Sequence, residues 1–380
     1  MISRSQLLRR FAFFLGFSVL IDRVAFFTFA GESDSSEFES FYRLPYQREM
    51  VALPYFLRYI SSQDAEEKNI IFLGSSPTYG ISIQSPQNTY PAALARSLAR
   101  SQPDLSNIAV YNVSSKGWLL SDIYYVLQRV IDDAEIFFIQ LNYHTFSQKI
   151  LDETVIRHPD LPQALGVPVS LAEAPLLGIQ SNPRANFNNS ISEWLKKYWF
   201  FYREADRIAL NLFGDIPDSA LYQLYRDRVF AAEEDLRDRY TAFTDLSPTQ
   251  QTIIANRYRE TSQVDLTSDR DSNTEFLFLQ KIIALLQKYD KNAIFFMAPL
   301  NVDALEFYDA IDWRQYETNV AAIANVVRSS GFQFIDYNPE PLMPEWFFSD
   351  ISHTTDEGGE YFGDRLFEDT KEAIETWLQP

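Results

Sequence analysis

The chain has 380 residues, with 33 Lys and Arg against 52 Asp and Glu, three His and no Cys. Its net charge of −19 repels phosphate backbones, which argues against a nucleic-acid partner. A hydrophobic content of 46% suffices for a buried core and excludes a wholly disordered chain. Because Cys is absent, disulfides, thiolate zinc sites, iron–sulfur ligation and a Cys nucleophile are excluded.

The segment Phe11–Ala30 has the length of a membrane-spanning helix. Three arginines precede it, which predicts that the N-terminus stays in the cytoplasm. Its seven Phe and five Val, Leu or Ile favour insertion by roughly 4 to 7 kcal/mol, whereas Asp22 and Arg23 cost roughly 5 to 7 kcal/mol. Insertion is therefore close to balanced, and pairing of the two charges or a partner helix would favour it.

Three interpretations of this segment are open. We favour an uncleaved signal anchor over residues 1–30, followed by a linker and helical lead-in over 31–67. A cleaved signal peptide ending at Ala30 and a short helix buried in a soluble core are the alternatives. The anchor predicts a single-pass protein of the cytoplasmic membrane whose remaining chain is extracytoplasmic.

Five short apolar runs have the length and the β-branched or aromatic content of buried parallel strands. Helical patterns separate them, and Ser121 at the start of one pattern is expected to cap its free N–H groups. Such alternation predicts a three-layer α/β domain with a mostly parallel sheet. The predicted strands are Ile70–Leu73, Ile108–Val113, Glu135–Leu141, Ala293–Ala298 and Phe332–Asp336, and the predicted helices are Pro91–Arg100, Ser121–Asp132, Glu275–Tyr289, Tyr316–Val327 and Glu357–Leu378.

The third and fourth predicted strands are about 150 residues apart, which is too far for a simple crossover. The interval is helical and aromatic in pattern. We therefore expect one catalytic domain over residues 68–380 that carries a helical insertion at about 150–275.

Polar residues follow the predicted strands, and ligands bind at the carboxyl ends of strands in an open parallel sheet. The run Gly74-Ser75-Ser76 follows the first strand, Gly117 lies in the loop after the second, and Asn142 ends the third. Asp350 and His353 lie after the fifth strand, just before the last helix. These are the residue types that acyl transfer through a serine requires.

A Ser hydroxyl becomes a strong nucleophile when an imidazole takes its proton, and a carboxylate fixes the tautomer of that imidazole. We therefore predict Ser76 as the nucleophile, His353 as the base and Asp350 as the residue that orients it. For the oxyanion we predict the backbone N–H groups of Ser76 and Gly117 and the side-chain amide of Asn142. Each residue also has a structural interpretation, as a turn residue, a cap or a loop contact.

The other two imidazoles are weaker choices, because neither His144 nor His158 has an Asp three residues before it. The three His also lack the spacing of a metal site, and no glycine-rich phosphate loop occurs. We therefore expect neither a metal nor a cofactor.

The residues of the predicted site resemble the sequence blocks of the SGNH (GDSL-like) hydrolase family, and especially its membrane-anchored DltD-type branch. Gly74-Ser75-Ser76 stands where the first block has its nucleophile, and Gly117 and Asn142 stand at the oxyanion positions of the second and third blocks. Residues 350–353 match the Asp-x-x-His of the fifth block. The likeness covers about residues 68–145 and 292–370 and the anchor. Ser75 replaces the usual Asp, and the third block lacks its usual Gly and acidic positions.

The resemblance implies a flavodoxin-like three-layer fold and ester chemistry outside the membrane. It implies that Ser76 accepts an acyl group from a donor and passes it to a hydroxyl of a cell-surface glycan. A membrane-bound O-acyltransferase is the partner that such relatives often have. Two alternatives are a carbohydrate esterase that uses water as the acceptor, and an inactive scaffold that binds polysaccharide or an assembly partner.

Overall fold

A computed structural model of the chain describes residues 13, 16–24, 43–44, 49–63, 68–101, 108–153, 156–158, 160–170, 173, 195, 199–200, 238–268, 270 and 272–378. The chain divides into two compact units. The unit made of residues 38–50, 56–179 and 233–380 contains the sheet and the predicted site. The other unit, residues 1–37, 51–55 and 180–232, lies largely outside the described residues.

Within the described part of the chain, every helix is too short or too polar to span a bilayer. Only residues 13 and 16–24 of the predicted anchor are described, and the rest of Phe11–Ala30 lies outside the described residues. The same holds for parts of the predicted linker at 31–67 and for much of the predicted insertion at 150–275.

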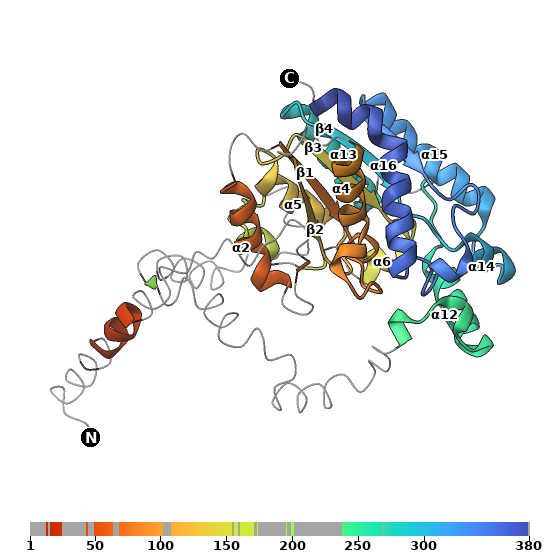
Figure 1. The fold of residues 1–380 in the computed structure, drawn as a ribbon, viewed down its shortest axis with the longest axis horizontal. Coiled ribbons are helices and arrows are strands. Elements are labelled where there is room, and N and C mark those ends of the chain that lie inside the picture. The colour runs from red at the N-terminus through yellow and green to blue at the C-terminus, as the bar shows by residue number, and fades with distance from the viewer. Residues whose placement is uncertain are drawn as a thin grey trace. The chain divides into compact units, whose positions relative to one another are not determined.

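Five strands form one parallel sheet in the order β2-β1-β3-β4-β5 (Figure 1). This is the flavodoxin-like order of a doubly wound sheet. All five predicted strands are confirmed, because each overlaps an observed one. The strands are β1 (Lys68–Gly74), β2 (Ile108–Ser114), β3 (Ile136–Leu141), β4 (Asn292–Met297) and β5 (Gln333–Asp336).

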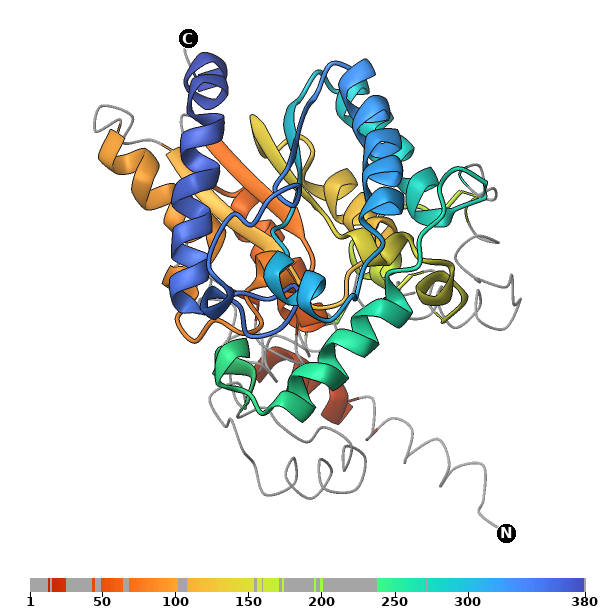
Figure 2. The same ribbon diagram turned by 90° about the vertical axis from the view of Figure 1, so that its right-hand side faces the viewer.

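Helices cover both faces of the sheet, with α4 (Tyr90–Ser101) and α16 (Asp356–Leu378) on one face and α5 (Leu120–Val130), α13 (Thr274–Lys288) and α15 (Trp313–Ser329) on the other (Figure 2). These five helices correspond to the five predicted from sequence, so the three-layer α/β architecture is confirmed. The remaining α-helices are α2 (Glu49–Ser61), α3 (Ser76–Tyr79), α6 (Gln148–Glu153), α7 (Leu161–Ala164), α12 (Pro248–Thr261) and α14 (Val302–Phe307), and the 3₁₀ turns are η2 (Pro86–Asn88), η3 (Tyr143–Phe146), η4 (Asp238–Tyr240), η5 (Phe243–Asp245) and η6 (Glu345–Phe347).

The expected Ser121 cap is wrong. Helix α5 begins one residue earlier, at Leu120, after Leu119 in the cap position. A carboxylate of the helix itself accepts the first N–H, since Asp122 Oδ2 lies 3.0 Å from the backbone nitrogen of Leu119. A second carboxylate, Glu275 of α13, accepts the next, from the backbone nitrogen of Leu120. Two buried acids therefore accept from the free N–H groups at the start of α5, where a serine cap was predicted.

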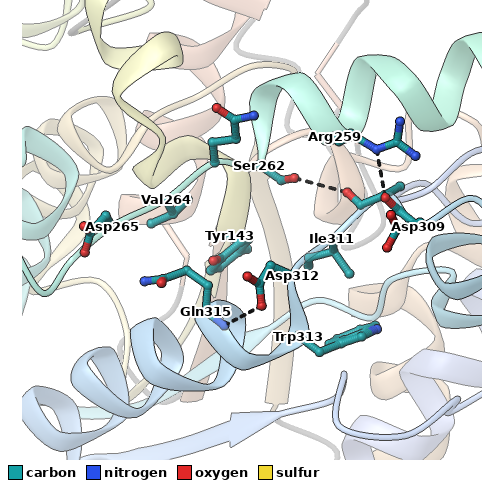
Figure 3. A pocket seen from close by; sticks show the side chains of 12 residues that line it. Tyr143, Arg259, Ser262, Val264, Asp265, Asp309, Ile311, Asp312, Trp313 and Gln315 are labelled. Carbon is teal, nitrogen blue, oxygen red and sulfur yellow. Dashed lines mark hydrogen bonds between the residues drawn. The ribbon is translucent and has the colours of Figure 1, made fainter.

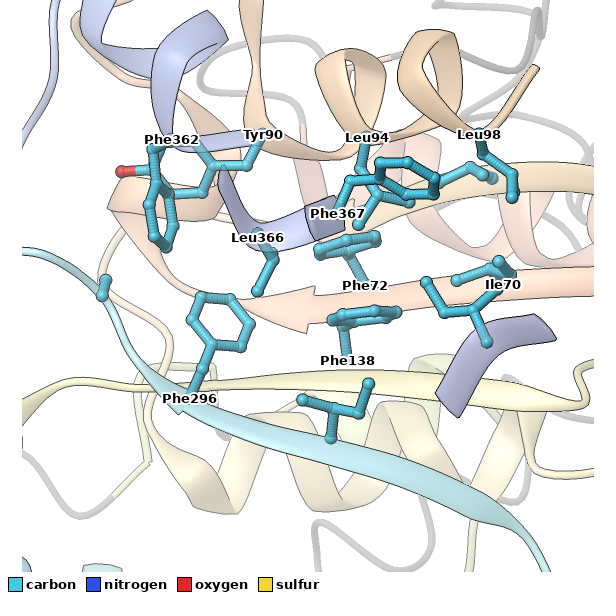
Figure 4. Close-up of a cluster of buried hydrophobic side chains, with 14 of the residues drawn as sticks. Ile70, Phe72, Tyr90, Leu94, Leu98, Phe138, Phe296, Phe362, Leu366 and Phe367 are labelled. Carbon is cyan, nitrogen blue, oxygen red and sulfur yellow. The ribbon is translucent and has the colours of Figure 1, made fainter. Parts of the chain in front are cut away.

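Alternate strand residues form the core between the sheet and the pair α4 and α16 (Figure 4). Phe72 of β1 and Phe138 of β3 are fully buried and stack with ring centroids 4.4 Å apart. Tyr90 of α4 meets Phe362 of α16 edge to face at 4.6 Å. This continuous aromatic core holds α16 against the sheet beside α4.

A glycine lets α16 approach α4 closely. A Cβ added at Gly363 would lie 2.4 Å from the Cβ of Ala93 and 2.7 Å from the carbonyl oxygen of Tyr90. Both neighbours belong to α4, so any larger residue would force the two helices apart. The contact therefore sets where α16 begins relative to the sheet edge.

Candidate active site

Ser76, His353 and Asp350 meet at the carboxyl end of β1. The Ser76 Oγ lies 2.8 Å from His353 Nε2, although the two residues are 277 positions apart in the chain. The other ring nitrogen, Nδ1, lies 2.6 Å from Asp350 Oδ2. The structure thus brings together the three residues that the sequence predicted as nucleophile, base and orienting acid.

The electrostatics of this group fix the direction of the hydrogen bonds. Burial opposes ionisation of Asp350, but the adjacent His353 and the backbone N–H groups of Ser352 and His353 outweigh it and lower the pKa of Asp350. An ionised carboxylate accepts the proton on Nδ1 of His353, which leaves Nε2 as the acceptor that faces Ser76. The imidazole is one-fifth exposed, so a substrate can approach it.

The turn that carries Ser76 is built on a buried glutamine. The Oε1 atom of Gln140, in β3, accepts from the Ser75 nitrogen at 2.9 Å and from the Thr78 hydroxyl at 3.0 Å. A Cβ at Gly74 would lie only 2.6 Å from that hydroxyl and 2.7 Å from that Oε1. Glycine at this position therefore allows β1 to end tightly against β3, which places Ser76 at the start of α3.

The predicted oxyanion donors lie on the two loops that flank this turn. The Asn142 amide donates to the Ser75 Oγ at 2.5 Å, so it reaches the residue next to the nucleophile. Gly117 lies in the loop after β2 with a φ of +69°, a conformation that favours glycine. Since Ser114 pairs with Gly74, the loops that hold Gly117 and Ser76 leave the sheet side by side. Their convergence on an oxyanion remains a prediction.

Backbone hydrogen bonds brace the loop that carries His353. The Ser349 nitrogen donates to the His353 carbonyl at 2.8 Å and so closes a tight turn around the Asp-x-x-His run. The Asn301 nitrogen, in the loop after β4, donates to the Ile351 carbonyl at 2.9 Å. The imidazole is therefore held by a loop with fixed partners at the sheet edge.

The first residue of α16 fastens this loop to the segment that follows Ser76. The Asp356 carboxylate accepts from the backbone nitrogens of Gln84 and Ser85, each at 3.1 Å, and from the Asn88 amide at 2.9 Å. Asp356 lies only three residues after His353. The nucleophile and base segments are thus tied together independently of the catalytic hydrogen bond.

The other two histidines do not compete for the base role. Burial and the nearby His353 lower the pKa of His144 to about 4. Burial and the nearby Arg157 lower the pKa of His158 to about 4. Both are therefore neutral at pH 7, and neither forms a hydrogen bond with Ser76, which has His353 as its imidazole partner.

A pocket of about 860 Å³ lies between α12 and the start of α15 (Figure 3). Tyr143, the residue after Asn142, is one of its lining residues, but none of the three triad residues lines it. The guanidinium of Arg259, which lines the pocket, donates to the Asp309 carbonyl at 2.8 Å. Three aspartates, Asp265, Asp309 and Asp312, also line it. The pocket is therefore acidic and separate from the triad. Its lining residues are Tyr143, Arg259, Ser262, Gln263, Val264, Asp265, Asp309, Ala310, Ile311, Asp312, Trp313 and Gln315.

Three buried polar residues near the site were not predicted from the sequence: Gln140, Asp122 and Glu275. A weak signal existed for Gln140, which is the one polar residue in the strand IFFIQL. Asp122 and Glu275 each lie in the first turn of a helix, where acidic residues are ordinary, so nothing marked them as buried. Among the described residues, no group of three or more His, Asp or Glu is arranged to hold a metal ion.

Comparison with known proteins yields little. No protein-family profile and no curated protein matches the chain. A solved structure of a candidate acylhydrolase from Bacteroides fragilis superposes with a TM-score of 0.36 at 10% identity, over 85% of this chain and 98% of that one. A superposition of this quality supports no inference about activity, which therefore depends on the geometry of the site.

Proposed function

We propose that this protein forms an acyl-enzyme on Ser76 and transfers the acyl group to a hydroxyl of a cell-surface glycan. The observation that carries the proposal is the continuous chain from Ser76 Oγ to His353 Nε2 at 2.8 Å and from His353 Nδ1 to Asp350 Oδ2 at 2.6 Å. A hydroxyl, an imidazole and a carboxylate in this order activate a serine for attack on an ester.

Acylation follows from these contacts. His353 Nε2 takes the Ser76 hydroxyl proton as Oγ attacks the carbonyl carbon of the acyl donor, and the Asp350 carboxylate stabilises the resulting imidazolium. The carbonyl oxygen becomes an oxyanion, for which the N–H groups of Ser76 and Gly117 and the Asn142 amide are the proposed donors. The bond to the leaving alcohol then breaks, and the imidazolium returns the proton to that alcohol.

Deacylation repeats these chemical steps with a different nucleophile. His353 removes a proton from an acceptor hydroxyl, whose oxygen attacks the acyl carbon on Ser76. The bond from that carbon to Ser76 Oγ then breaks, Oγ takes the proton from His353, and the acylated product leaves. A glycan hydroxyl as acceptor gives transfer, and water gives hydrolysis. The glycan acceptor, the membrane anchor and an O-acyltransferase partner are proposed on the resemblance to DltD-type proteins.

The test uses the full chain in detergent, incubated with p-nitrophenyl acetate. We expect a stable or transient acetyl group on the peptide that contains Ser76, detected by mass spectrometry after an acid quench. Ser76→Ala should abolish it, and His353→Ala should slow its formation by about 10⁶-fold. Ser329→Ala, which changes an exposed serine at the end of α15, is the matched control and should behave like the parent protein.

The same reaction separates the three functions when cellotriose is added as an acceptor. Acetylated trisaccharide that forms at the expense of free acetate supports transfer. Free acetate alone, at a rate that the trisaccharide does not change, supports the esterase. Absence of any Ser76 adduct would contradict the proposal and favour the third function, an inactive scaffold.

A further inference from the structure

The two proposed oxyanion donors outside the nucleophile turn come from different loops. Gly117 follows β2 and Asn142 follows β3, and these strands flank β1 on opposite sides. An oxyanion hole requires donors held in place before the reaction, because donors that must reorganise contribute little. Some group must therefore hold both loops in register with Ser76.

One buried carboxyl contacts both loops. Glu275, in the first turn of α13, is only 1% exposed. Its Oε1 and Oε2 accept from the Leu120 nitrogen at 3.0 and 3.2 Å, and its other side-chain partner is the Thr145 hydroxyl. Leu120 lies three residues after Gly117, and Thr145 lies three residues after Asn142.

Thr145 carries this link back to the Asn142 backbone. Its hydroxyl lies 2.8 Å and its nitrogen 3.3 Å from the Asn142 carbonyl, to which both donate. Beside it, the amide of Asn273, which caps α13, donates to the Phe146 carbonyl at 2.8 Å. The start of α13 is therefore bonded to the turn that presents Asn142.

A second buried carboxylate supports the other loop. Asp122 Oδ2 accepts from the Leu119 nitrogen at 3.0 Å and from the Arg157 nitrogen at 3.1 Å, and Oδ1 accepts from the His158 nitrogen at 3.1 Å. The chain just after Gly117 is thus held from two directions. Both acids are buried and each accepts from at least one backbone N–H group, and burying acids is costly unless they are bonded in this way.

We infer that Glu275 is a positioning residue that sets the loops of Gly117 and Asn142 in register for the oxyanion. The inference rests on the proposed function, since it assigns a purpose to contacts of the same site. Glu275 does not touch the triad, and it acts only through Leu120 and Thr145.

The test compares Glu275→Ala with Glu275→Gln on the acetylation of Ser76. The alanine variant should lower kcat by about 10–100-fold with little change in KM, because the lost interaction matters in the transition state. The glutamine variant keeps an accepting oxygen and should stay within about threefold of the parent. Glu306→Ala, an exposed glutamate on α14, is the control.

A double-mutant cycle distinguishes positioning from plain loss of stability. If Glu275 acts through Asn142, then Glu275→Ala combined with Asn142→Ala should lose clearly less activity than the product of the two single losses. Independent effects that multiply would overturn the inference, as would an alanine variant with a lower Tm and unchanged kcat. Should Glu275→Ala fail to fold, Thr145→Val removes one of the two links and must show the same coupling to Asn142.

Amide hydrogen exchange keeps this inference separate from the proposed function. If the parent protein never acetylates Ser76, the proposed function fails, but the link can still be measured. Glu275→Ala should then speed exchange selectively in residues 118–121 and 143–147. Exchange that is unchanged there, or that rises uniformly over the sheet, would overturn the inference.

Discussion

Replacing Glu275 by Gln should remove a measurable part of the pH dependence of stability. Burial raises the pKa of Glu275 from 4.5 to about 8, against the lowering effect of its hydrogen bonds with the Leu120 nitrogen and the Thr145 side chain. Between these values the unfolded chain releases a proton that the folded chain keeps, so stability falls as pH rises. The fall is about 1.4 kcal/mol per pH unit and on the order of 5 kcal/mol over the whole interval. Below pH 4.5 and above pH 8 this contribution is flat.

Urea unfolding at pH 5, 6, 7 and 8 measures the effect as a difference between the parent and Glu275→Gln. Groups that do not interact with Glu275 cancel, so the free energy of unfolding of the parent minus that of the variant should fall by about 4 kcal/mol from pH 5 to pH 8. Glu306→Gln, an exposed control, should give a constant difference. A constant difference for Glu275→Gln as well would show that Glu275 ionises as in the unfolded chain, and the reasoning would fail.

Three further substitutions probe the site and its support. Asp350→Asn should lower kcat for ester turnover by about 10³–10⁴-fold at an unchanged Tm, because an amide no longer fixes the His353 tautomer; a loss below tenfold in steady-state assays would contradict the orienting role. Gly74→Ala would place a methyl group 2.6 Å from a neighbouring hydroxyl oxygen and should reduce both acylation and stability, the latter by about 1–3 kcal/mol in urea unfolding. Gly363→Ala should destabilise the chain by a similar 1–3 kcal/mol and should also lower kcat per folded molecule, because it shifts the start of α16 and with it His353, whereas Glu368→Ala at an exposed position of the same helix should leave both the Tm and kcat unaltered.

The sheet could be predicted from the sequence because its strands are buried on both faces. A run such as the one in β3 needs no alternation of polar and apolar residues, and its length alone favours a strand over a helix. The start of α5 could not be predicted. Its N–H groups are satisfied by Asp122 and Glu275, and Glu275 is 155 residues away in sequence. Propensity favours Ser121 as the cap, and a tertiary contact overrides that choice.

The three residues of the candidate triad could be predicted because histidine is scarce in this chain. Only three His exist, and only His353 has an Asp three residues before it and lies beyond the last strand. The support of the site could not be predicted in the same way. Gln140 bonds Ser75 across 65 residues, and its place in an apolar strand indicates burial but does not show which turn it organises. Such residues can be identified only from their burial and their hydrogen-bond partners, and both are known only once the fold is known.

The strand order explains why residues from opposite ends of the chain meet at Ser76. After β1 the chain moves to β2 on one side, then returns to β3 on the other, so β1 ends at the point where the winding reverses. The chain later reaches β5 at the far edge, yet α16 packs on α4, beside β1 and β2. The segment between β5 and α16 must therefore cross the carboxyl edge of the sheet, and it ends above β1. His353 lies at the end of this crossing, three residues before Asp356 fastens α16 to the segment that follows Ser76. Close packing of α16 on α4 at Gly363 fixes where the crossing ends, so the imidazole position depends on a helix contact remote from the chemistry.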